Sequence, residues 1–180
     1  MKVFAYCTEP AGRMVGEAVG VSPLTSPPMT AADFRPSLLE GYDFIYIRLH
    51  GLPQVLDLWL GERLDGGLLP ALTRNHIEAA DLTDAVILLA NCYGASSPMA
   101  QEMYDSGARA VIAGHGPNYA AGKTIRGADL LAKWFLIALR GGAPPPAALT
   151  MAKSRLAMSS WRKSDRDTLE FSIIRSIKNE

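Results

Sequence analysis

Two short apolar runs, each followed at once by a chemically reactive side chain, constrain this chain more than any other feature. Residues 43–49 are almost entirely apolar and lead into His50 and a glycine, and residues 85–91 lead into Cys92, with a glycine two positions later. Apolar runs of this length without polar alternation are typical of strands buried on both faces of a parallel sheet. Because the carboxyl ends of parallel strands meet at one edge of the sheet, we expect His50 and Cys92 to lie close together.

The rest of the chain alternates strand-like and helix-like segments, which predicts an α/β fold: a three-layer αβα sandwich with a mostly parallel central sheet. Residues 8–29 are rich in glycine and proline and are expected to form a loop, with a short strand near 15–21. No repeat or linker interrupts the pattern, so residues 1–180 are expected to form a single domain. The further strands are expected at 2–7, 108–113 and 169–174, a small edge hairpin at 58–62, and helices at 30–40, 70–80, 97–106, 125–139 and 145–159.

Composition excludes several classes of partner. The 180 residues include 18 basic and 18 acidic side chains, so no positive excess favours nucleic acid or an anionic membrane surface. No apolar stretch approaches the roughly 20 residues that span a bilayer, and the start lacks the pattern of a signal peptide. The chain has 2 cysteines, too few for a disulfide framework. A reducing cytoplasm is therefore the expected compartment.

A cysteine beside a histidine is a potential nucleophile with its base. A free thiol has a pKa of about 8.5, so at neutral pH it needs a neighbouring imidazole to take its proton. The backbone N–H groups of Gly51 and Cys92 are candidates for an oxyanion hole at the same place. The alternative is structural: His50 as a hydrogen-bonded buried histidine and Cys92 as a small core residue.

Other reactive side chains follow predicted strands and are weaker candidates. His115 follows the strand expected at 108–113, so it either lines the substrate site, serves as an alternative base, or is an ordinary loop residue. Glu9 follows the first strand and is a candidate acidic group of the pocket. Cys7 ends that strand and is expected to be buried and structural. The closely spaced ligand pairs of zinc sites are missing, so neither a metal nor another cofactor is expected.

Order and spacing of these residues resemble those of a known family. In caspases the nucleophilic cysteine is followed two residues later by glycine, and a histidine lies about 50 residues upstream; Cys92 and His50 have that order and nearly that spacing. Over residues 2–174 the chain is similar to the caspase-like cysteine peptidases of the caspase–hemoglobinase fold, and most to the bacterial CHAT-type branch. The segments that carry this likeness are 47–51, 58–62, 88–92 and 100–112, followed by a long helix, a Gly-Gly break and a further helix.

The resemblance implies a caspase-like central sheet and a cysteine endopeptidase that acts on protein or peptide substrates. It makes His50 the general base and Cys92 the nucleophile, without a cofactor. It also leaves open activation by a separate partner protein or by cleavage. Ala90 stands where caspases have glutamine, which argues against specificity for aspartate. CHAT relatives often prefer basic residues before the cleaved bond, for which Glu9 would be the acid.

Two other functions stay open at this point. One is an amidase similar to glutamine amidotransferases, in which Cys92 pairs with the downstream His115. Such enzymes place the nucleophile on a sharp turn, commonly with glycine two residues before and after it, and Ala90 replaces the first of these. The other is a catalytically inactive caspase-like interaction domain.

Overall fold

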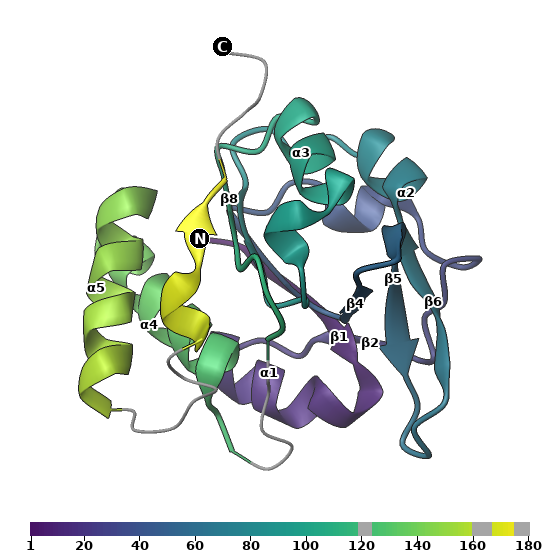
Figure 1. Ribbon diagram of the computed structural model, residues 1–180. Coiled ribbons are helices and arrows are strands. Elements are labelled where there is room, and N and C mark those ends of the chain that lie inside the picture. Colours follow the sequence, from purple (N-terminus) through teal and green to yellow (C-terminus); the bar gives the residue numbers. More distant parts are fainter. Residues whose placement is uncertain (119–123, 160–166, 175–180) are drawn as a thin grey trace.

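A six-stranded sheet forms the centre of the computed structural model, which describes residues 1–118, 124–159 and 167–174 (Figure 1). The strand order is β2-β1-β3-β7-β8-β9; the first five strands are parallel, and β9 runs antiparallel to β8. Helices cover both faces, which confirms the predicted α/β sandwich. The strands are β1 (Val3–Thr8), β2 (Leu24–Ser26), β3 (Phe44–Arg48), β7 (Val86–Leu89), β8 (Ala110–Ala113) and β9 (Ser172–Ile173).

Three helices pack on one face of this sheet: α1 (Gly12–Val19), α4 (Gly127–Arg140) and α5 (Pro145–Ser159). Their buried side chains share one apolar core with β1, β3, β7 and β8, in which the rings of Phe44 and Phe135 lie 5.9 Å apart. Helix α4 is the most deeply buried of the three, because its apolar residues recur at helical spacing and meet the sheet along one side.

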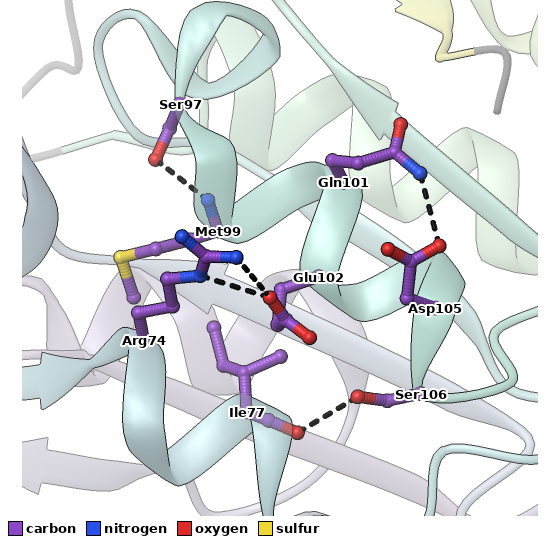
Figure 2. A network of polar contacts seen from close by, with 8 residues as sticks. All are labelled: Arg74, Ile77, Ser97, Met99, Gln101, Glu102, Asp105 and Ser106. Atoms are coloured by element: carbon purple, nitrogen blue, oxygen red, sulfur yellow. Dashed lines mark hydrogen bonds and ion pairs between the residues drawn. The ribbon is translucent and has the colours of Figure 1, made fainter. Parts of the chain in front are cut away.

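The opposite face is covered by α2 (Arg74–Glu78), α3 (Pro98–Asp105) and a small antiparallel sheet with the order β4-β5-β6. Its strands are β4 (His50–Leu52), β5 (Val55–Glu62) and β6 (Leu68–Thr73). Trp59 of β5 is 1% exposed and fills the core on this side. Figure 2 shows how α2 is fastened to α3: Arg74 donates two hydrogen bonds to Glu102, and the hydroxyl of Ser106 donates one to the carbonyl of Ile77.

Helix boundaries agree with the sequence where a local capping signal marks them. The hydroxyl of Ser97 accepts a hydrogen bond from the backbone N–H of Met99, and Pro98 occupies the first helical position, so α3 begins where predicted (Figure 2). Gly107 follows α3 with a φ of +103°, a conformation that side chains rarely adopt. The bounds predicted for α5 are confirmed as well.

The prediction for residues 8–29 is wrong. Instead of a loop with a strand near 15–21, this segment contains the 3₁₀ helix η1 (Glu9–Ala11), then α1 and then β2. Gly12 and Gly16 weaken the helical signal. Both lie in close contact with the following segment, since a side-chain carbon there would lie 3.2 Å from the Thr25 side chain and 3.3 Å from the Val21 carbonyl oxygen.

Three further segments also differ from the prediction. The expected helix 70–80 begins only at Arg74, because Pro70 belongs to β6, an edge strand that tolerates a residue without an N–H. Residues 58–62 belong to the middle strand of the small sheet rather than to an edge hairpin. The expected helix 30–40 is the 3₁₀ helix η2 (Pro36–Leu39), and the last predicted strand is preceded by η4 (Thr168–Glu170).

Candidate functional site

A cavity of about 340 Å³ lies at the carboxyl ends of β1, β3 and β7. The connection after β1 leads through α1 to β2 on one side of β1, whereas the connection after β3 leads to β7 on the other side, so the strand order reverses between β1 and β3. Open α/β sheets bind their ligands at such a reversal of strand order. The lining residues are Thr8, Pro10, Ala11, Arg48, Leu49, His50, Glu62, Ala90, Cys92 and Asn118.

Backbone contacts hold the ends of β3 and β7 side by side at the cavity. The N–H of Ala90 donates to the Ile47 carbonyl oxygen at 2.8 Å, and that of Leu49 donates to the side-chain oxygen of the fully buried Asn91 at 3.4 Å. His50 and Cys92 follow these two linked segments directly, and both line the cavity. Their relative position therefore depends on strand pairing rather than on a loop.

Gly51 brings the His50 segment against the backbone of Cys92. A side-chain carbon at Gly51 would overlap the Cys92 carbonyl oxygen, so only glycine allows the two chains to approach this closely. The oxyanion hole proposed for the N–H groups of Gly51 and Cys92 stays a prediction.

Glu62, at the end of β5, is hydrogen-bonded to the imidazole of His50. Its Oε2 lies 2.8 Å from His50 Nε2, and the two side chains are 31% and 41% exposed, so the pair is open to a ligand. With Nε2 donating to the carboxylate, Nδ1 carries the free lone pair of a neutral imidazole. Sequence reasoning gave Glu62 no role, because only the pairing of β4 with β5 brings it to His50.

The thiol of Cys92 is half-buried and contacts the backbone of Asn118. The N–H of Asn118 points at Sγ from 3.2 Å, and its side-chain amide donates to the Ala90 carbonyl oxygen at 2.6 Å. Among the described residues, no hydrogen bond joins His50 to Cys92. Such bonds are often long in enzymes without substrate and tighten when the substrate binds, so their absence does not argue against a catalytic pair.

The turn after Cys92 is strained. Tyr93 has a φ of +56°, in the left-handed region that residues other than glycine, asparagine and aspartate seldom adopt. Its N–H donates to the Gly116 carbonyl oxygen at 3.0 Å, and Gly94 packs tightly between Leu89 and Ala113. Backbone strain of this kind gathers at functional sites, where the surrounding structure holds it in place.

The other two candidate residues do not join this cavity. The side chain of His115 is exposed and lines a second cavity of about 280 Å³, which neither His50 nor Cys92 lines. Glu9 is half-buried in η1, between two lining residues of the first cavity, but does not line it itself.

A buried ion pair lies behind the cavity wall. Arg48 Nη1 is 2.6 Å from Asp129 Oδ2, and the hydroxyl of Tyr46 donates to Asp129 Oδ1 at 2.7 Å. Asp129 is only 1% exposed, so burial raises its pKa, while Arg48 and the Tyr46 hydroxyl act in the opposite direction. Burial also raises the pKa of Tyr46 well above its ordinary value. Sequence reasoning missed this group, although an arginine that ends an apolar strand was a usable signal.

The two cysteines differ sharply in environment, and this predicts selective alkylation. Cys7 is fully buried, and burial raises the pKa of its thiol to about 12, whereas Cys92 lines the open cavity. Because the thiolate is the reactive form, iodoacetamide at pH 7.5 should modify Cys92 at least about 100-fold faster than Cys7. Peptide mapping after brief labelling measures both rates, and faster labelling of Cys7 would contradict the assignment of Cys92.

Two structural findings bear on alternative kinds of site. Within the described ranges, no group of three His, Cys, Asp or Glu side chains converges so as to hold a metal ion. In the same part of the chain, no helix combines the length and the apolar character that crossing a membrane requires.

Comparison with family models and with curated proteins adds no relative. No protein-family model matches the chain, and no curated protein matches it. Its function must therefore be argued from the geometry of the cavity.

Proposed function

We propose that this protein is a cysteine endopeptidase in which Cys92 is the nucleophile, His50 the general base and Glu62 the residue that orients the base. The observation that carries the proposal is that a thiol and a carboxylate-bound imidazole line one open cavity at the ends of two paired strands. A nucleophile, a base and a third group that orients the base are the usual parts of covalent acyl transfer.

The proposed reaction proceeds in two halves. His50 Nδ1 takes the thiol proton, and the sulfur of Cys92 attacks the peptide carbonyl carbon. The N–H groups of Gly51 and Cys92 stabilise the oxyanion. As the C–N bond breaks, the imidazolium gives its proton to the leaving amine, and a thioester stays on Cys92. Water, deprotonated by His50, then attacks the thioester and releases the carboxylic acid and the free thiol.

Membership of the caspase-like peptidases, close to the CHAT-type branch, is part of the same proposal. It is supported by the order of His50 and Cys92 along the chain and by their places after two paired parallel strands. The amidase alternative has less support, because the base that it requires, His115, lines a different cavity. Activation by a partner protein or by cleavage stays part of the proposal that the family resemblance suggests.

The experiment that tests the proposal uses peptides with an electrophilic acyloxymethyl ketone in place of the scissile bond. A mixed set of such peptides should form a thioether with Cys92, detected as a mass increase on the peptide that contains it. The parent protein should also cleave a matched peptide library. A parent protein that neither reacts at Cys92 nor cleaves any member of the library would contradict the proposal.

Glu62→Gln is expected to lower kcat at least about tenfold while KM changes little, because the carboxylate that holds His50 in its working tautomer is lost. The matched control is Glu102→Gln. Glu102 is also a partly buried carboxylate in an ion pair, but it accepts from Arg74 on α2 (Figure 2) and does not line the cavity. Equal losses in both variants, or a rise in KM alone for Glu62→Gln, would show that Glu62 does not orient the base.

A further inference from the structure

We propose that the outer side of α4 and α5 is a docking surface for an amphipathic helix of a partner protein, in which acidic side chains flank an apolar stripe. This surface, the α4–α5 face, consists of Lys133, Trp134 and Ile137 on α4 and Met151, Arg155 and Met158 on α5. None of the six lines the cavity that holds Cys92, so the inference does not depend on the proposed peptidase activity.

A groove of about 410 Å³ lies between the two helices, near the connection that joins them. Only residues 141–144 separate α4 from α5, the helices pack side by side, and α5 is the outermost element on the left of Figure 1. Trp134 and Ile137 line the groove from α4, and Met151 and Arg155 line it from α5. From Trp134 to the connection is about two helical turns, a length that a short helix can fill.

Apolar side chains stay exposed along this groove. Ile137 is 47% exposed, Met151 is 50% exposed, and Met158 is 85% exposed. The two methionines are seven positions apart and therefore share one side of α5. A row of exposed apolar groups beside a groove is typical of an interaction site, and methionine adapts easily to the shape of a partner.

Trp134 leaves a polar group of the face without a partner. Its Nε1–H is shielded from solvent and has no acceptor among the described residues. The guanidinium of Arg155 lies 4.8 Å from the centre of the indole ring, and the ammonium of Lys133 lies 5.9 Å from it. Buried indole N–H groups usually have an acceptor, so this one indicates that the face is incomplete in the isolated chain.

The charge on these helices determines which partner is favoured. Residues 124–159 include five basic side chains and one acid, Asp129, which is buried in an ion pair. Within the described ranges, the two basic members of the face, Lys133 and Arg155, form no ion pair. A helix with carboxylates beside its apolar stripe complements this charge, whereas a basic helix would be repelled.

A protein helix fits these observations better than a membrane surface does. The whole chain has no net charge, so it gains no long-range attraction to an anionic bilayer. The apolar side chains also border a hollow rather than form a ridge. A bilayer cannot fill such a hollow, but the side chains of a third helix can pack into it.

Peptide binding tests the inference directly. The probe is a fluorescein-labelled peptide with three copies of the heptad Leu-Ala-Ala-Leu-Glu-Ala-Glu, which places leucines on one side of a helix and glutamates on both flanks. Fluorescence anisotropy with the parent protein gives its Kd. We expect it to bind at least about tenfold tighter than the same peptide with glutamine in place of glutamate. Equal affinities, or no measurable binding, would overturn the inference.

Variants test whether the peptide binds at the α4–α5 face. Arg155→Glu should weaken binding of the acidic peptide at least about tenfold, and Ile137→Ser at least about threefold, because charge and apolar contact both contribute. The matched controls are Arg109→Glu and Leu64→Ser, which change exposed side chains of the same kinds outside the face and should bind like the parent. Controls weakened as much as the face variants, or face variants that bind like the parent, would overturn the inference.

The same proteins distinguish the alternative occupants. Vesicles of phosphatidylserine and phosphatidylcholine that sediment the parent but not Arg155→Glu, without binding of the acidic peptide, would assign the face to a membrane. A dimer of the parent in sedimentation velocity that is lost in Ile137→Ser, again without peptide binding, would assign the face to a second copy of the chain. Either result would overturn the proposed helical partner.

Discussion

Cys92→Ala is expected to abolish peptide hydrolysis, and His50→Ala to lower kcat/KM about as far, by roughly 1,000-fold or more. The two losses should be similar because base and nucleophile act as one unit, and removing either leaves only the binding and oxyanion contributions. His115→Ala should retain most of the activity, since His115 is exposed and lines the second cavity.

The comparison is made on the peptide that the parent protein cleaves fastest, and thermal unfolding shows whether each variant is folded. His115→Ala is the matched control, because it removes the same imidazole from another strand end of the same sheet. Activity lost in His115→Ala and kept in His50→Ala would overturn the assignment and favour the amidase.

Gly51→Ala is expected to lower turnover at least about 100-fold, even though it adds only one methyl group. The added carbon would overlap the Cys92 carbonyl oxygen, and backbone cannot move aside as the end of a side chain can. The His50 and Cys92 segments must therefore separate, and a displacement of about 1 Å between reacting groups costs roughly 100-fold in rate. Overpacking of this kind also destabilises the fold, by about 1–3 kcal/mol.

Gly116→Ala provides the control for this change. A side-chain carbon at Gly116 has nothing within 4 Å, and its φ is not in the left-handed region. Both variants add the same methyl group to a glycine that follows a reactive histidine. Gly116 lines the second cavity, and the added carbon meets Cys92 only at Gly51. Rates of hydrolysis and denaturant midpoints are measured for both. A Gly51→Ala protein as active as Gly116→Ala would show that close contact between the two segments is not needed.

Several elements could be predicted because their signals are local. The strands around 43–49 and 85–91 are short apolar runs, and such runs favour burial on both faces whatever the rest of the chain does. Helix α3 has its serine cap and its proline within two residues of each other. The α/β sandwich follows from the alternation of such elements, so the sequence was sufficient for the fold class.

The first helix and the small sheet depended on tertiary contacts. Helix α1 contains glycines that lower its intrinsic helical preference, and it forms because its apolar side, with Val15, Ala18 and Val19, packs in the core against the sheet and α4. Pro70 looks like a helix start but lies in a strand, because an edge position needs no N–H from it. Local propensity misleads at such positions, since packing against distant residues outweighs it.

The candidate site also has residues that local sequence signals predict and residues that only tertiary contacts bring in. The sequence by itself placed His50 and Cys92 at the ends of two buried strands, since that inference needs only an apolar run and the residue that follows it. Which charges surround them was decided by tertiary structure alone: Glu62 reaches His50 through the pairing of β4 with β5, and Asp129 reaches Arg48 across 81 residues. Periodicity reports which face of an element is buried, but it holds no information about which distant side chain will meet it there.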